Sequence, residues 1–341
     1  MKVHFIYQLQ DGPFGGGNQF LKALKKHALM RGVYTENLAE ADVVLYNSFE
    51  YMPQAAAAKL RYPEKVFIHR VDGPIRLYNI MSDQRDRLVN LTNSLMADGT
   101  VFQSNWSRLQ NLKFGLQKSP FRQTIVNAPD PVVFNTNGRI LFSPLRKIRL
   151  ICSSWSPNWK KGFLAYQRLD QLLDFTRIEM LFIGNSPVSF RNIEVRGPVG
   201  SSELARALKA ADIYITASQS DPCSNSLLEA LHCGLPCIAL RDGGHPEIIG
   251  EGGALFEEVE QVPAIIDSMA GAYESYRSKI SVLHIDSVGN QYLSFMQQIL
   301  DRVLFRDCQP KCLSRFGYAR IMGAHMLWRL SINHRLRWLF H

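Results

Sequence analysis

Short apolar runs rich in β-branched and aromatic residues alternate along the chain with longer stretches of helical periodicity. In the first part of the chain these runs are VHFIY, DVVLYN, KVFIH and DGTVFQ, and the alternation restarts with IRLICSS, EMLFIG, DIYIT and PCIAL. Strands that alternate with helices form parallel sheets with helices on both faces. The pattern therefore predicts an α/β protein with two doubly wound, Rossmann-like domains.

The alternation pauses between the two sets of strands, at NAPDPVVFNTNGRILFSPLRK, where three prolines and a glycine interrupt regular structure. We place the domain boundary there and predict domains at residues 1–145 and 146–285. A polar and apolar segment of helical spacing follows, and we predict that residues 286–307 form a helix that packs back toward the first domain. Residues 308–341 remain as a basic tail.

The composition fits an ordered protein without a membrane span. The 341 residues, of which 46% are hydrophobic, suffice for two α/β domains and exclude a mainly disordered chain. No apolar run approaches the roughly 18 residues that a spanning helix needs. The start MKVHFIYQLQDG resembles a strand entering a loop more than a signal peptide, and the six cysteines include no CxxC pair. We expect a cytoplasmic protein.

Most of the net charge of +9 lies in the tail, where residues 306–341 hold seven Lys and Arg against one Asp. The tail also has an apolar stripe at three- and four-residue steps. Its members are Tyr318, Ile321, His325, Trp328, Ile332, Leu336 and Leu339. An Arg-rich amphipathic helix can lie on an anionic membrane surface, or its stripe can pack on the first domain or support a dimer. We expect no nucleic-acid partner.

Two segments suggest where a ligand binds. Gly15, Gly16 and Gly17 follow the first predicted strand, so backbone amides there can approach an anion or a sugar, although such glycines also form simple tight turns. The second segment, residues 218–253, carries a polar loop that leads into a predicted helix.

The start of that predicted helix suits a diphosphate. Ser224, Asn225 and Ser226 can expose unpaired amides at its positive end. Glu229 can accept two hydrogen bonds from vicinal ribose hydroxyls, and Asp221 can accept from sugar hydroxyls. The alternative makes Asp221 or Ser224 a helix cap and Glu229 an ordinary helical acid.

This segment resembles the donor-binding motif of retaining GT-B glycosyltransferases of the glycogen-synthase-like group, the group 1 or family 4 type. The motif is an acid, then a Glu eight positions later that begins E-A-x-x-x-G-x-P. The matching residues are Asp221, Glu229, Ala230, Gly234 and Pro236, followed by Gly243, Gly244 and Glu247 in a Gly-Gly-x-x-Glu turn. FGGGNQF, NAPDPVVF and SWSPNWKKG are similar to further family segments, and the resemblance covers roughly residues 3 to 300.

The resemblance implies two Rossmann-like domains that face each other across a cleft. It also assigns donor-binding roles to Gly16, Gly17 and Lys160, and both donor-binding and catalytic roles to Lys161 and Asp221. Trp155 occupies the position of the family's phosphate-binding Arg and supplies no charge. Lys160 then either compensates or belongs, with Lys161, to a solvated charged pair.

His69 follows the strand KVFI and matches the position where many family members place a His that faces the reacting sugar. The resemblance makes it a candidate catalytic residue, whereas a lone His at a strand end is often held by backbone partners. Arg70 and Asp72 lie on the same loop, where they either hold the acceptor or form an ion pair that ties the loop.

The implied activity is transfer of a sugar from a uridine or guanosine diphosphate sugar, with retention, to a glycan or lipid-linked acceptor. We expect no metal and no cofactor, because Lys and helix amides replace the cation and no metal-ligand spacing is present. Bacterial surface polysaccharide or glycoconjugate synthesis is the expected setting. The alternatives are an epimerase or hydrolase of nucleotide sugars, and a catalytically silent nucleotide-sugar-binding subunit.

Overall fold

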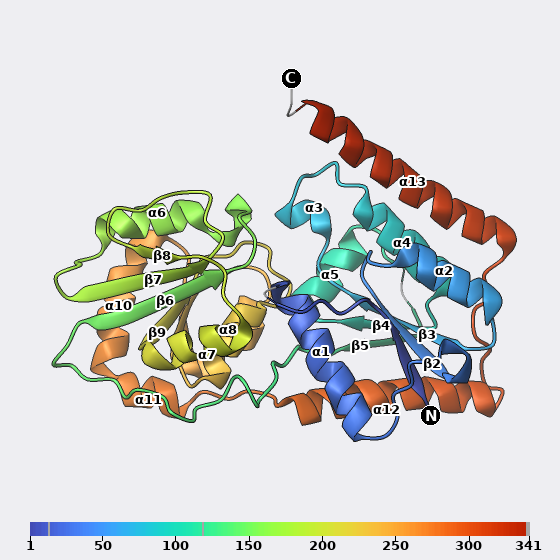
Figure 1. The fold of residues 1–341 in the computed structure, drawn as a ribbon, viewed down its shortest axis with the longest axis horizontal. Helices are drawn as coiled ribbons and strands as arrows, with labels where there is room; N and C mark the ends of the chain where they lie inside the picture. The colour runs from blue at the N-terminus through green and yellow to red at the C-terminus, as the bar shows by residue number, and fades with distance from the viewer. Residues whose placement is uncertain (13, 118, 339–341) are drawn as a thin grey trace. The chain divides into compact units, whose positions relative to one another are not determined.

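The computed structural model describes residues 1–12, 14–117 and 119–338, and it divides them into two compact domains. The first domain consists of residues 1–8, 25–126 and 289–341, and the second of residues 9–24 and 127–288. The predicted ranges differ in three places, since residues 9–24, 127–145 and 286–288 group with the second domain. Figure 1 shows a parallel sheet in each.

The first sheet contains five described strands in the order β1-β2-β3-β4-β5, all parallel. They are β1 (Val3–Ile6), β2 (Val43–Asn47), β3 (Val66–Val71), β4 (Gly99–Phe102) and β5 (Phe121–Thr124). Every residue of β2 and β3 is buried, as expected for interior strands covered on both faces. The helices that belong wholly or partly to this domain are α1 (Gly15–Met30), α2 (Met52–Arg61), α3 (Ile75–Tyr78), α4 (Arg85–Met96), α5 (Asn105–Lys113), α12 (Ile285–Leu304) and α13 (Arg315–Trp338), with a short 3-10 turn η1 (Leu38–Glu40). The first part of α1, up to residue 24, groups with the second domain.

The second sheet has six described parallel strands in the order β11-β10-β9-β6-β7-β8. They are β6 (Ile148–Ser154), β7 (Ile178–Gly184), β8 (Glu194–Arg196), β9 (Ile213–Thr216), β10 (Cys237–Leu240) and β11 (Gly253–Phe256). Its helices are α6 (Phe163–Leu172), α7 (Ser201–Ala210), α8 (Asn225–His232), α9 (His245–Ile249), α10 (Val262–Gly271) and α11 (Tyr273–Ser278), and its 3-10 turns are η2 (Trp159–Lys161), η3 (Gly250–Gly252) and η4 (Val259–Gln261). The chain runs from β6 outward to β8 and then returns to the other side of β6 as β9, so the strand order reverses between β6 and β9.

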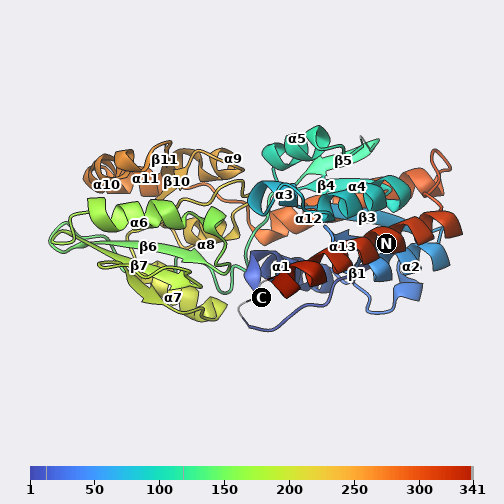
Figure 2. The ribbon, with the colours of Figure 1, turned by 90° about the horizontal axis from the view of Figure 1, so that it is seen from above.

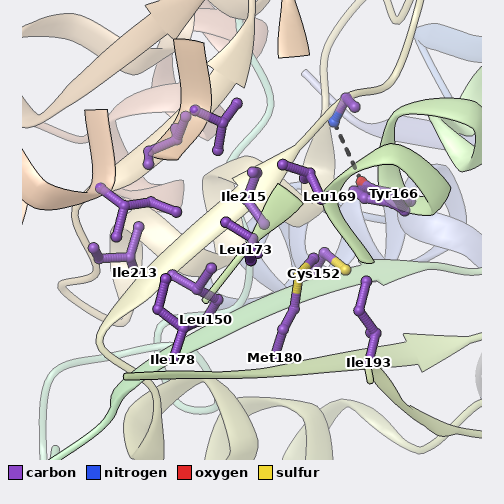
Figure 3. Close-up of a cluster of buried hydrophobic side chains, with 14 of the residues drawn as sticks. Leu150, Cys152, Tyr166, Leu169, Leu173, Ile178, Met180, Ile193, Ile213 and Ile215 are labelled. Carbon is purple, nitrogen blue, oxygen red and sulfur yellow. Dashed lines mark hydrogen bonds between the residues drawn. The ribbon is translucent and has the colours of Figure 1, made fainter. Parts of the chain in front are cut away.

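Side chains that alternate between the two faces of β6 contribute to the core of the second domain. Leu150 and Cys152 lie on one face of the sheet, since successive side chains of a strand point to opposite faces. Figure 3 shows them packed with Leu169 and Ile215. The hydroxyl of Tyr166 in this cluster accepts a hydrogen bond of 3.2 Å from the Ala217 amide, which satisfies a polar group at the end of β9.

The predicted 286–307 helix is α12, and it covers the first sheet. A Cβ at Gly99 of β4 would lie 2.5 Å from Ile299 Cδ1 and 3.1 Å from Phe295 Cε1, so the helix lies directly against the strand there. Near its start, a Cβ at Gly289 would lie 2.3 Å from the His27 ring of α1.

The tail forms a helix whose predicted apolar stripe packs on the first domain. Ile321 is fully buried in a cluster with residues of α2 and α4, and Tyr318 and Trp328 pack against that cluster. Figures 1 and 2 both show α13 alongside these two helices. Of the remaining stripe, the side chains of Ile332 and Leu336 are not described, and Leu339 lies outside the described residues. In the described part of the chain, no helix combines the length and apolar character required to cross a membrane.

Candidate functional site

The candidate site lies at the carboxyl ends of β6 and β9, where the strand order of the second sheet reverses. Ligands of open parallel sheets bind at such reversal points, because the connections leave in opposite directions and open a crevice. The loop after β6 leads to η2, which carries Lys160 and Lys161. The loop after β9 carries Asp221 and leads to α8.

Lys161 and Asp221 form an ion pair at this edge, with Lys161 Nζ 2.9 Å from Asp221 Oδ2. The Ser218 hydroxyl donates to the same oxygen over 3.1 Å, and the Cys223 amide donates to Oδ1 over 3.2 Å. Burial would raise the pKa of Asp221, but the charge of Lys161 holds that pKa below its usual range. Asp221 is therefore ionised and orients the lysine, which is itself partly exposed to solvent.

Two glycines allow the backbone to reach this arrangement. Gly162 has φ +96°, and a Cβ there would lie 2.6 Å from the Ala217 carbonyl oxygen. Gly243 has φ +60°, and a Cβ there would lie 2.3 Å from the Asp221 carbonyl oxygen. Both positions need the left-handed conformation and leave no room for a side chain. The Gly244 amide donates to the same Asp221 carbonyl over 2.8 Å, which fixes the loop.

The amino terminus of α8 faces this loop. Ser224 occupies the N-cap position, yet its side chain makes no capping hydrogen bond with any described helix amide. Its hydroxyl instead lies 3.2 Å from that of Ser226, while the Asn225 side chain accepts from Asn127 Nδ2 over 3.0 Å. The first amides of α8 thus carry the positive end of the helix dipole without a side-chain cap from Ser224. This arrangement suits an anion.

The glycine loop reaches the same place. A Cβ at Gly16 would lie 2.3 Å from Asn225 Cβ, so only a glycine permits this approach to α8, whereas a Cβ at Gly17 would meet no described atom within 4 Å. A Cβ at Gly15 would lie 3.5 Å from the Trp155 ring. Phe14 and Trp155 have ring centroids 5.8 Å apart, and both side chains are more than 40% exposed. Two aromatic surfaces therefore border the glycine loop beside α8.

Glu229 lies one turn into α8 and is only 7% exposed. No described residue donates a hydrogen bond or forms an ion pair with its carboxyl group. Burial raises the pKa of Glu229 to about 8. This raised pKa distinguishes Glu229 from an ordinary solvated helical acid. Its geometry fits a carboxylate that receives its donors from a ligand.

Two further residues, Lys160 and His245, lie near the ion pair of Lys161 and Asp221. Lys160 is exposed, and its carbonyl accepts from the Gln219 amide over 2.7 Å, so its backbone ties the two loops together. His245, which sequence reasoning missed, is fully buried near Asp221. Its Nδ1 lies 2.9 Å from the Leu240 carbonyl, its Nε2 has no described partner, and burial lowers its pKa. The only signal in the sequence was its place after the Gly243-Gly244 pair.

The predicted residues His69, Arg70 and Asp72 belong to the first domain. His69 is fully buried, with Nε2 2.9 Å from the Ser48 carbonyl and Nδ1 3.1 Å from Asn93 Nδ2. Burial lowers the pKa of His69 to about 3, so the ring is neutral. This is the geometry of the alternative role, a structural histidine held by its neighbours, and we do not include His69 in the proposed site.

Arg70 and Asp72 form the ion pair that was one of their two predicted roles, with Nη1 3.2 Å from Oδ1. Arg70 Nη1 also donates to Asn47 Oδ1, at the end of β2. Glu50 follows the same strand, and burial together with the charge of Asp72 raises its pKa to about 7. Sequence reasoning missed Glu50, although an acid just after a buried strand was visible. These polar and charged side chains therefore lie together at the carboxyl edge of the first sheet.

Within residues 1–12, 14–117 and 119–338, no group of three or more His, Cys, Asp or Glu side chains is placed to hold a metal ion.

The chain resembles known proteins in both sequence and fold. Residues 146–275 match the family described as glycosyl transferases group 1. The Arabidopsis thaliana sulfoquinovosyl transferase SQD2 is 36% identical over 74 residues, which are 22% of this chain and only 13% of that protein.

Similar solved structures extend the likeness to most of the chain. Anabaena HepE in complex with UDP and glucose has a TM-score of 0.64 at 16% identity and covers 89% of this chain and 99% of its own. A glycosyltransferase from Rickettsia africae has a TM-score of 0.59 at 14% identity and covers 86% of this chain and 84% of its own. At this identity the likeness establishes the fold, which is the GT-B class with two Rossmann-like domains. Residues 146–275 of this GT-B chain are therefore similar to the family of glycosyl transferases group 1.

Proposed function

We propose that this chain is a glycosyltransferase that binds a nucleoside diphosphate sugar at the carboxyl ends of β6 and β9. The observation that carries the proposal is Glu229, a buried carboxyl group without a described partner, one turn from the amino terminus of α8. Two vicinal ribose hydroxyls are suitable donors for this group, and the helix amides are suitable donors for phosphate oxygens. The structure of Anabaena HepE with UDP-glucose supports a uridine nucleotide as the first donor to test.

The diphosphate is held by Lys161 and the α8 amides, with Lys160 as a further cation beside them. Trp155 and Phe14 supply ring surfaces against the sugar, because aromatic faces pack well on the C–H groups of a pyranose. At the position where the family has an Arg that binds phosphate, this chain thus has a Trp that packs on the sugar.

In the proposed reaction the bond between the anomeric carbon and the phosphate oxygen breaks, and negative charge grows on the departing diphosphate. Lys161, oriented by Asp221, and the α8 amides stabilise that charge. The acceptor hydroxyl attacks from the same face and its proton passes to the departing phosphate, which gives retention without a protein nucleophile. Asp221 contributes as a positioning residue.

The acceptor is a glycan or a lipid-linked sugar, and Asp72 and Glu50 of the first domain are its candidate contacts, since carboxylates suit sugar hydroxyls. Arg70 is fully buried, so its proposed role on the acceptor side is to orient Asp72 through their ion pair. Synthesis of bacterial surface polysaccharide or glycoconjugates, on the cytoplasmic side of the membrane, is the setting that we propose.

Calorimetric titration of UDP, GDP and their sugars tests the donor site. Glu229→Gln and Lys161→Met each remove one charge-assisted contact, so each is expected to weaken binding by roughly ten- to a hundredfold. Glu251→Gln changes an exposed acid of the same domain and serves as the matched control. If both site variants bind as tightly as the control, the assignment of the site is wrong.

Incubation of the protein with the bound donor distinguishes the alternatives. A transferase forms a glycoside only when an acceptor is added, an epimerase or hydrolase converts the donor alone, and a silent subunit binds without turnover. Retention is read from the anomeric configuration of the product by NMR.

We also propose that turnover needs no metal, because Lys161 and the α8 amides take the place of a divalent cation at the diphosphate. The rate in excess chelator is then expected to equal the untreated rate. Activity that disappears in chelator and returns with Mg²⁺ or Mn²⁺ contradicts this.

A further inference from the structure

Over residues 315–331, whose side chains the structure describes, helix α13 has two apolar faces, and one of them packs on the first domain. Ile321 and Trp328 point toward α2 and α4. The opposite face carries large apolar side chains in solvent. They are Phe316, Met326, Leu327 and Leu330, which are 75%, 62%, 60% and 51% exposed. Exposed Ala319 and Gly323 lie between them.

The arrangement of this outward face is regular. At about 100° per residue, the six outward positions fall within an arc of about 100°, on the side away from Ile321 and Trp328. Arg315 and Arg320 lie at the two edges of that arc, and Arg329 lies beyond the first edge. All three arginines are exposed. No acidic residue occurs in the helix sequence from Arg315 to Trp338.

Hydrogen bonds hold the segment just before α13 in place. The Lys311 amide, just before α13, donates to Asp98 Oδ1 over 2.6 Å. The other Asp98 oxygen accepts from buried Lys59 Nζ over 3.1 Å and from the Phe67 amide over 2.7 Å. These hydrogen bonds hold the start of α13 against the first sheet. The outward face is therefore exposed while α13 stays packed on the first domain, so a partner can bind there without displacing the helix.

We propose that the outward face of α13 docks on an anionic lipid surface. An apolar stripe edged by arginines fits the boundary between head groups and acyl chains, where the apolar side chains enter and the guanidinium groups meet lipid phosphates. A second copy of the chain is a poor occupant, because a two-fold contact between identical faces would bring arginines against arginines with no acid between them. The inference does not depend on the proposed donor chemistry.

Sedimentation of the full-length protein with vesicles tests this proposal. Binding is expected to vesicles that contain phosphatidylglycerol and not to phosphatidylcholine alone. The triple variant Phe316→Ser, Leu327→Ser and Leu330→Ser changes only exposed side chains, so it is expected to keep its melting temperature and lose binding. The matched control substitutes Leu141, Leu145 and Leu164 with Ser, since these are also more than half exposed and belong to the second domain.

Replacing Arg315, Arg320 and Arg329 with Gln is expected to weaken vesicle binding by roughly a hundredfold, since each cation contributes at the lipid surface. Three results would overturn the proposal. The first is that the full-length protein does not sediment with anionic vesicles at low salt, and the second is that it binds neutral and anionic vesicles equally. The third is a dimer, detected by light scattering, that the apolar triple variant abolishes.

Discussion

At the scale of single residues, the burial of Glu229 makes a prediction about protons. Its pKa is raised from 4.5 to about 8, so the folded protein keeps a proton that the unfolded chain releases. This contribution to stability is fully present below pH 4.5 and is lost as the pH rises through about 8. Glu229→Gln is therefore expected to flatten the decline in the free energy of unfolding between pH 5 and 8.5, measured by urea denaturation at roughly half-unit steps.

The same carboxyl group is proposed to ionise when the donor binds. Calorimetry at pH 7 in buffers of different ionisation enthalpy is expected to show release of up to about one proton per UDP bound, and none in Glu229→Gln. A variant that binds UDP as the wild type does, with the same proton release, would remove Glu229 from the site.

Trp155 predicts a separation between sugar and phosphate recognition. Trp155→Ala is expected to weaken UDP-sugar binding about five- to tenfold and leave UDP binding nearly unchanged, because the lost contact is to the sugar ring. Trp155→Arg adds a charge and is expected to tighten UDP binding. Trp159→Ala is the control, as Trp159 is similarly exposed and packs edge-on against Phe163. Equal losses for UDP and UDP-sugar in Trp155→Ala would contradict the separation.

At the scale of helices, two glycines give opposite predictions. Gly289→Ala in α12 would force a methyl group to within 2.3 Å of the His27 ring, so a loss of about 1 to 3 kcal/mol in the free energy of unfolding is expected. Gly323→Ala in α13 meets no described atom within 4 Å and is expected to stabilise by up to about 1 kcal/mol through helix propensity. Chemical denaturation measures both, and equal effects would mean that α12 does not pack on α1.

Helix periodicity predicted α12 within three residues of its observed bounds and gave the inward stripe of α13. It did not identify the outward face, because Phe316, Met326 and Leu327 fall among the positions that a single-stripe pattern assigns to solvent. Periodicity shows that a helix has an apolar face, but it does not show which surface covers that face.

At the scale of the whole molecule, the alternation of strands and helices sufficed to predict two parallel α/β domains. It did not predict that residues 9–24 and 127–145 group with the second domain, because such contacts join segments that are far apart in sequence. Lys161, Asp221 and Glu229 were singled out where their motifs resemble those of the family, and their role in donor binding stays a prediction. The hydrogen-bond partners of His69 come from Ser48 and Asn93, which no local pattern connects to it.

The proposed donor site lies entirely within the second domain. Substitutions that destabilise the first domain are therefore expected to leave the affinity for UDP unchanged. In scanning calorimetry, UDP is expected to raise the unfolding transition of the second domain, by roughly the mass-action term for ligand binding. Gly289→Ala is expected to lower the transition of the first domain and leave UDP affinity within about twofold of the wild type. A parallel loss of affinity would show that the two domains do not act independently.

The first domain is completed only by residues 289–341, which follow the whole of the second domain in sequence. During synthesis, the first sheet therefore emerges from the ribosome long before α12 exists to cover β4. At typical elongation rates, the intervening 127–288 segment takes roughly 8 to 30 seconds to translate. For that interval the second domain can fold while an apolar face of the first sheet stays open, and this face is where a nascent-chain chaperone is expected to bind.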